Sequence, residues 1–196
     1  VGQQVRLYLS ETLTAQGTCN QKQSGSPYYL TYTLSGKGEK SADGKRIETW
    51  HPHFTYYGYR YIQVEGAVMK GDENPDGKPV IEDIQSCFVY NSAAKIGNFE
   101  CSNPMFNRAS QIIDRAIRSN WQAVWTDCPH REKLGWLEQD WLNGEGLVYN
   151  YDCRSMIEQT LQNIADAQHA NGAVPTTAPE YIYFKGKWLD PFAESP

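Results

Sequence analysis

The seventeen residues WTDCPHREKLGWLEQDW (125–141) combine six charged side chains with one histidine, one cysteine and three tryptophans. Cys128-Pro129 ends any helix that reaches it, because proline lacks an amide hydrogen and clashes with the preceding turn. Gly135 allows a second sharp change of direction. We therefore expect residues 127–135 to form a loop between two helices. Loops held by rigid helices commonly bear binding and catalytic residues, so this loop is the first candidate site.

Helical patterns flank this loop on both sides. Asn103-Pro104 supplies an N-cap side chain and a proline at the first helical position. Apolar residues then recur every three or four positions as far as Val124, which predicts a helix of about five or six turns. A shorter helix is predicted near 137–148. Another is predicted over about 155–169, where Asn171-Gly172 supplies the stop.

The first 90 or so residues alternate as β-strands do. Strands are predicted around Val5, Leu7 and Leu9, at 29–34 and at 59–64, with Gly, Pro and Asp clusters between them that favour turns. Many short strands at this spacing indicate an antiparallel β-sandwich.

The change of pattern predicts two domains, a β-sandwich over residues 1–97 and a helical domain over 98–196. The N-terminus lacks a starting Met and the features of a signal peptide. The C-terminus stops without a closing helix or a cap. We therefore interpret the chain as a fragment of a longer protein.

The composition restricts the class of partner. The chain is 40% hydrophobic, enough for a core, and carries a net charge of −5 at pH 7. Nucleic acids and anionic membranes need a positive patch, so we expect neither partner, and no apolar run is long enough to span a bilayer. The aromatic content of 13% suits packed β-surfaces and the apolar faces of sugars. The five cysteines show neither paired nor metal-ligand spacing, so we expect mostly reduced thiols, no metal and no cofactor.

The side chains of the 127–135 loop suit glycoside hydrolysis, which needs a protonated carboxyl for the leaving oxygen and a second carboxylate to attack or activate water. Glu132 is the candidate acid, because Trp136 can exclude water from it and so raise its pKa. Asp127 and Arg131 can bind sugar hydroxyls. Cys128 lacks the partners of a nucleophile and is interpreted as a packing residue. A purely structural interpretation, with a cap, a solvated ion pair and a core tryptophan, fits the spacing equally well.

The segment DCPHREKLGW (127–136) resembles the signature DCPQRxERxGW of bacterial α-L-rhamnosidases of glycoside hydrolase family 78, with one residue fewer between the arginine and the glutamate. The segment WHPHFTYYGYRYIQVEG (50–66) is similar to the strand pair that closes the last β-sandwich of that family. The segment ECSNPMFNRASQIIDRAI (100–117) is similar to its first barrel helix. Together these resemblances cover most of the chain.

The resemblance implies β-sandwiches followed by an (α/α)6 barrel, and removal of terminal α-L-rhamnose with inversion. Glu132 aligns with the general acid, Asp127 and Trp136 with sugar-contacting positions, and Arg131 with the arginine of the loop, which we also assign to substrate binding. Trp188 matches a tryptophan that lines the sugar pocket, although a core position suits it equally. The family's base lies on a later barrel helix, so the chain alone is expected to be inactive. Three helices of such a barrel also leave an apolar face uncovered.

Two positions depart from the family pattern. His130 stands where a glutamine is usual. The usual aspartate three residues after the tryptophan is replaced by Gln139, which is flanked by Glu138 and Asp140. We prefer Asp140 for this substrate-binding role, because its side chain is shorter and stiffer than that of Glu138.

Two alternatives remain open at this point, another six-hairpin glycosidase and a non-catalytic carbohydrate-binding module. The expected partner is a rhamnose-containing oligosaccharide or glycoside. By analogy with the family, we expect a periplasmic or secreted protein of a bacterium, although reduced cysteines also suit the cytoplasm. The sequence gives no indication of oligomeric state.

Overall fold

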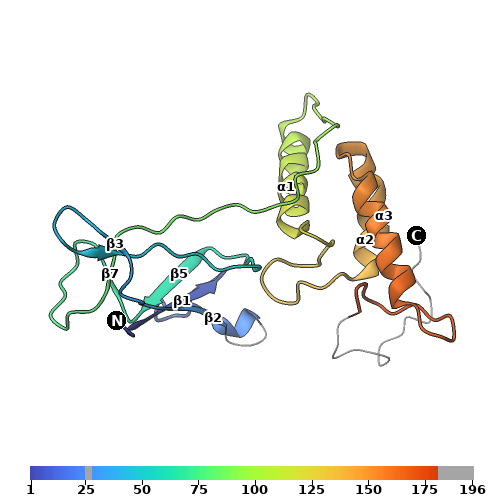
Figure 1. Cartoon of the computed structure of the whole chain (residues 1–196). Helices are drawn as coiled ribbons and strands as arrows, with labels where there is room; N and C mark the ends of the chain where they lie inside the picture. The colour runs from blue at the N-terminus through green and yellow to red at the C-terminus, as the bar shows by residue number, and fades with distance from the viewer. Residues whose placement is uncertain (25–27, 181–196) are drawn as a thin grey trace. The chain divides into compact units, whose positions relative to one another are not determined.

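A computed structural model describes residues 1–24 and 28–180 (Figure 1). The chain divides into two compact units, the first comprising Val1–Phe88 and the second beginning at Val89. The strands and a short 3-10 helix, η1 (Gln21–Ser24), lie in the first unit, and the α-helices lie in the second.

A three-stranded antiparallel sheet forms the centre of the first unit. Its strand order is β2 (Tyr29–Thr33), β1 (Gln4–Ser10), β5 (Tyr61–Glu65), which confirms the three predicted strands. Leu7 of β1 lies opposite Leu30 on one side and Val64 on the other. Because side chains alternate along a strand, Val5 and Leu9 share one face, and they are only 8% and 3% exposed.

Two short strand pairs accompany this sheet. The first, β3 (Glu39–Lys40) with β4 (Arg46–Ile47), is antiparallel, and its turn contains Gly44 at φ +84°. The second, β6 (Val68–Met69) with β7 (Val80–Ile81), is parallel and so departs from the antiparallel pairing predicted. The chain between β6 and β7 is a long loop rather than a tight hairpin, so it can return to the same end before pairing. Within this loop the Asn74 side chain donates to the Lys78 carbonyl and accepts from the Lys78 amide, both at 2.8 Å.

The three predicted helices are confirmed as α1 (Pro104–Asn120), α2 (Leu137–Asn150) and α3 (Arg154–Ala167). As predicted, Asn103 caps α1, its side chain accepting from the Met105 amide at 2.9 Å. The helix stops at Asn120 rather than continuing to Val124. It stops there because the chain folds back on itself, pairing Trp121 with Trp125 across an isolated bridge.

A tryptophan-rich cluster forms the core of the helical unit. Its buried members are Trp121, Trp125, Leu147, Tyr151 and Cys153. The rings of Trp125 and Tyr151 meet that of Trp121 edge to face, with centroids 5.1 and 5.3 Å away. This geometry is favourable for aromatic pairs. The cluster therefore joins the end of α1 to the turn between α2 and α3.

The segment that precedes α1 is hydrogen bonded to the helical unit. Asn91 donates its amide to the Trp121 carbonyl at 2.9 Å, and Ile96 and Gly97 both donate to Asn150, at 2.9 and 3.1 Å. A side chain at Gly97 would meet the Tyr149 carbonyl oxygen, so this close approach requires glycine.

Apolar surface remains uncovered on the helices, as predicted for part of a barrel. No residue of α1 is buried, and Ile112 and Ile113 are 56% and 58% exposed. Trp141 and Leu142 of α2 are similarly exposed. Across residues 1–24 and 28–180, no helix combines the length and apolar character needed to cross a bilayer. All five cysteines lie in the described part of the chain and are free thiols.

Candidate active site

The 127–136 loop is anchored at both ends by buried residues. On one side, Trp125 and Thr126 are 4% and 3% exposed, and Thr126 donates its amide to the Asn120 carbonyl at 3.0 Å. On the other side, Leu137 begins α2 and is 3% exposed. As predicted, the loop connects two helices, so a rigid scaffold holds it.

Two bonds from side chains to the backbone fold this loop into a compact turn. Asp127 Oδ1 accepts from the Leu134 amide at 3.2 Å. Cys128 Sγ accepts from the Glu132 amide at 3.2 Å. Lys133 adopts a left-handed backbone conformation with φ +52°, which is uncommon for a residue with a Cβ. The Cys128 side chain therefore fixes the backbone at Glu132 by this hydrogen bond. The sequence had suggested only a packing role for Cys128.

The Glu132 carboxylate is held by two neighbouring side chains. Arg131 Nη2 lies 2.5 Å from its Oε1, and Trp136 donates its indole N–H to Oε2 at 3.1 Å. The Glu132 side chain is 34% exposed and that of Arg131 52%. Trp136 thus meets Glu132 through a polar contact, whereas the sequence had suggested apolar shielding by the ring. Both bonds fix the direction of the carboxyl group while leaving part of it open to solvent.

The first turn of α2 bears the positions that depart from the family pattern. Gln139 accepts from Asn143 Nδ2 through its backbone carbonyl at 3.0 Å and through its side-chain oxygen at 3.4 Å, so its side chain lies along the helix. Glu138 is exposed, whereas Asp140 is partly buried. Burial raises the pKa of Asp140 to about 6.

We expect Asp140→Asn to stabilise this chain at neutral and alkaline pH. Asp140 has a pKa of about 3.9 in the unfolded chain. Below that pH it is protonated in both the folded and unfolded states, so wild type keeps its full stability there. Part of that stability is lost as pH rises through the folded pKa of about 6. Denaturant unfolding of both proteins from pH 4 to 8 should show an advantage of the variant that grows from about pH 4 to about pH 6 and is constant above that. A difference that stays constant with pH would exclude the burial of Asp140 as its cause.

A second segment, residues 173–180, packs against the end of the 127–136 loop. Ala178 donates its amide to the Gly135 carbonyl at 2.9 Å, and Leu137 donates to the Thr176 carbonyl at 3.1 Å. Between these bonds Trp136 and Thr177 form an isolated bridge, and Thr177 is only 1% exposed.

This contact explains why a glycine stands at position 135. A Cβ added to Gly135 would lie 2.5 Å from the Ala178 carbonyl oxygen, too close for any larger residue without a backbone shift. The sequence predicts only a turn at Gly135 and gives no indication of the pairing with residues 176–178. Strand-like pairs of so few residues have no periodic pattern that could reveal them.

The predicted site residues are thus partly assembled. Arg131 and Trp136 both contact Glu132, and Asp127 accepts a hydrogen bond from the backbone within the same loop. Asp140 lies on the adjoining first turn of α2. Trp188 lies outside the described residues.

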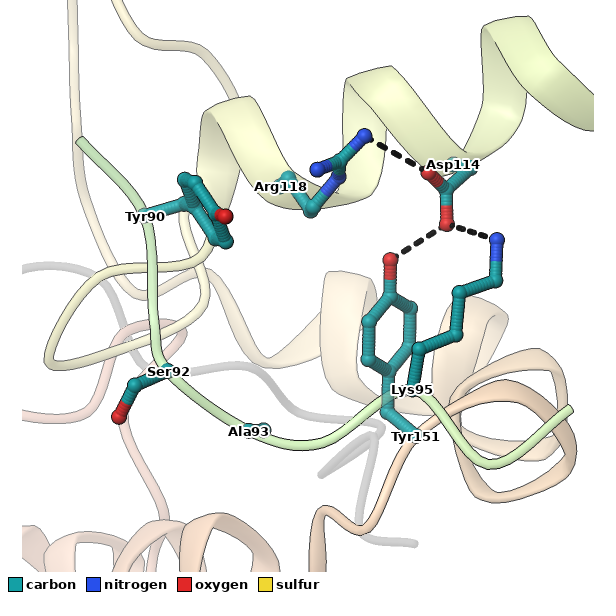
Figure 2. A pocket seen from close by; sticks show the side chains of 7 residues that line it. All are labelled: Tyr90, Ser92, Ala93, Lys95, Asp114, Arg118 and Tyr151. Carbon is teal, nitrogen blue, oxygen red and sulfur yellow. Dashed lines mark hydrogen bonds and ion pairs between the residues drawn. The ribbon is translucent and has the colours of Figure 1, made fainter. Parts of the chain in front are cut away.

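A cavity of about 500 Å³ lies elsewhere in the helical unit (Figure 2). Its lining residues are Tyr90, Ser92, Ala93, Lys95, Asp114, Arg118 and Tyr151. Asp114 of α1 accepts from the Tyr151 hydroxyl and from Lys95 Nζ, and Arg118 pairs with its other oxygen at 3.0 Å.

The charged groups of this cavity form ion pairs with one another. Burial alone would raise the pKa of Asp114, but the hydrogen bonds from Lys95 and Tyr151 outweigh it and lower that pKa. This network ties α1 to the preceding segment and to the α2–α3 turn, which is a structural role.

Comparison with known proteins identifies the two units. Residues 94–194 match the family model of the bacterial α-L-rhamnosidase six-hairpin glycosidase domain, and residues 1–90 match that of the bacterial α-L-rhamnosidase concanavalin-like domain. The fold class is therefore a β-sandwich followed by part of a six-hairpin glycosidase domain, as predicted. The chain belongs to the bacterial α-L-rhamnosidase family.

Individual relatives agree with this assignment. An α-L-rhamnosidase of Streptomyces avermitilis is 32% identical over 180 residues, which is 91% of this chain and 16% of that protein. One from Formosa agariphila is 28% identical over 169 residues, covering 83% of this chain and 16% of its own length. The chain thus spans about a sixth of the length of these curated relatives.

Solved structures resemble this fold over most of the chain. The α-L-rhamnosidase from Dictyoglumus thermophilum matches with a TM-score of 0.72 and 26% identity, covering 92% of this chain and 19% of the other. The Streptomyces avermitilis α-L-rhamnosidase complexed with L-rhamnose matches with a TM-score of 0.71 and 28% identity, covering 96% of this chain and 17% of the other.

Proposed function

We propose that this chain is part of an inverting glycosidase that removes terminal non-reducing α-L-rhamnose from glycans or glycosides. The proposal rests chiefly on the 127–136 loop, in which Arg131 and Trp136 hold the carboxyl group of Glu132 on a rigidly anchored turn. Membership of the α-L-rhamnosidase family and the relative complexed with L-rhamnose support the choice of sugar.

In this proposal Glu132 is the general acid. It donates a proton to the glycosidic oxygen as the bond to the sugar breaks, which spares the leaving group a negative charge. When Glu132 is protonated, its Oε2 can still accept from Trp136 as the carbonyl oxygen. Its Oε1, which Arg131 contacts in the structure, then carries the proton to the leaving oxygen while Arg131 turns to the sugar hydroxyls. Asp127, Arg131 and Asp140 are assigned to the binding of sugar hydroxyls, for which charge-assisted hydrogen bonds are well suited.

Inversion also requires a general base on the opposite face of the sugar. The two carboxyl groups of inverting enzymes are roughly 6.5–9.5 Å apart, which leaves room for the attacking water. We propose that the base comes from a part of the longer protein outside these 196 residues. Both the acid and the base are then needed for turnover.

A panel of aryl glycosides tests the reaction and the sugar together. The longer protein that contains this chain should hydrolyse the α-L-rhamnoside, with product anomers showing inversion by NMR, and should be at least about a hundredfold slower on aryl glucosides and other aryl sugars. The 196-residue chain alone should release no aryl group. Preference for another sugar would indicate a different six-hairpin glycosidase, and binding without turnover would indicate a carbohydrate-binding module. Hydrolysis by the chain alone would contradict the assignment of the base.

A further inference from the structure

After α3 the chain turns, pairs with the 127–136 loop and then returns to His169. It first turns at Gly172, whose amide donates to the His169 carbonyl at 2.8 Å, while His169 donates its own amide to Ala173 at 2.9 Å. Gly172 has φ +87°, which favours glycine. We call residues 173–180 the bracing segment, because they pack against the loop that bears Glu132.

At its far end this segment returns to His169 through a contact with Glu180. His169 Nε2 lies 3.6 Å from Glu180 Oε2, an ion pair when the imidazole is protonated. The two side chains are only 25% and 13% exposed, so the contact is largely withdrawn from water. Both ends of the bracing segment are therefore held at His169, one through its backbone and the other through its side chain.

Between these two ends the bracing segment pairs with the backbone around Trp136, the residue whose indole contacts the candidate acid. Its residues Thr176 and Ala178 bond the backbone of Leu137 and Gly135 on either side of Trp136. Trp136 in turn donates its indole N–H to Glu132. A continuous series of contacts thus runs from Glu180 to the Glu132 carboxyl.

We propose that Glu180, held by His169, is a positioning residue for Glu132. This inference rests on the proposed function, because it assigns Glu180 a role in placing the general acid. Glu180 acts through the backbone pairing of the bracing segment, which orients the indole of Trp136. Small displacements of an acid group relative to its substrate cost large factors in rate, so the pair contributes mainly to turnover.

The first test measures the pairing itself and does not depend on enzymatic activity. Amide hydrogen exchange by NMR on the 196-residue chain should show Leu137 and Ala178 exchanging about tenfold faster in Glu180→Ala, since their bonds open locally. Amides within α1 should be unaffected. Glu180→Gln, which keeps the size of the side chain but removes its charge, should show the same faster exchange, because 3.6 Å to His169 is an ion-pair distance and not a hydrogen-bond distance. Glu158→Ala is the matched control, because it removes the partner of Arg154 on the exposed face of α3.

The second test measures catalysis in the longer protein. Glu180→Ala should lower kcat for a poorly activated α-L-rhamnoside by about ten- to a hundredfold with little change in KM. The loss should shrink for a p-nitrophenyl leaving group, which needs less protonation. Glu180→Gln should show the same pattern, because it also removes the charge that faces His169. A purely structural role would lower kcat equally for both leaving groups.

The outcomes separate this proposal from the proposed function. Unchanged exchange at Leu137 and Ala178, or faster exchange with normal kcat for both leaving groups, would overturn the positioning role of Glu180. If instead Glu132→Gln proved fully active, the assignment of the acid would fail, while the exchange result would still report on the bracing segment.

Discussion

Glu132→Gln in the longer protein is expected to reduce kcat for an unactivated α-L-rhamnoside by about 10²–10⁴-fold, the range typical of losing a general acid. KM should change little, because glutamine keeps the size of the side chain and can still accept from the Trp136 indole. The effect is therefore on the transition state, where the proton is transferred, more than on binding. Steady-state kinetics with a rhamnose disaccharide provide the measurement.

The dependence on the leaving group makes this prediction specific. A p-nitrophenolate leaves readily without protonation, so its release should fall by a much smaller factor in Glu132→Gln than release of an alkyl alcohol. Glu158→Gln, the same substitution at an exposed position of α3, should behave as wild type. Equal losses for both leaving groups would point to a binding role for Glu132, and unchanged turnover would remove it from the mechanism.

Trp121→Ala is expected to have the largest effect on stability. Trp121 is only 1% exposed and its ring contacts Trp125 and Tyr151. Removing so large a buried side chain typically costs about 3–5 kcal/mol, because it loses transfer free energy and leaves a cavity. Since Trp125 lies two residues before Asp127, where the loop begins, the loss should loosen that loop as well. Urea unfolding of the helical unit, followed by near-ultraviolet circular dichroism, measures the change.

Trp141→Ala in the same chain is the matched control. Trp141 lies on α2 and is 61% exposed, so its removal should alter the free energy of unfolding by about 0.5 kcal/mol or less. Equal destabilisation by the two substitutions would show that the cluster around Trp121 is not the core of the helical unit.

Local signals in the sequence were sufficient to place the main elements. Asn103-Pro104 located the start of α1, and alternation around Leu7 located β1, because caps and periodicity depend on neighbours along the chain. The end of α1 was misplaced beyond Asn120, since its apolar period runs on to Val124 while the packing of Trp121 against Trp125 turns the chain away. The parallel pairing of β6 with β7 likewise depends on the path of the long loop between them, which the sequence does not predict.

The candidate site was likewise predicted in part from the sequence and in part decided by the tertiary structure. The segment DCPHREKLGW indicated the loop, its family and the residues Asp127, Arg131, Glu132 and Trp136, whose roles remain predictions. The tertiary structure alone decided that Trp136 meets Glu132 through its N–H, that Asp140 is partly buried, and that residues 176–178 brace Gly135. The Asp140 feature arises from burial, and the bracing of Gly135 arises from a contact between segments about 40 residues apart. The Trp136–Glu132 bond joins residues four apart, but it depends on how the loop folds. None of these three features produces a periodic pattern in the sequence, because each depends on which groups meet once the chain has folded and the helices have packed.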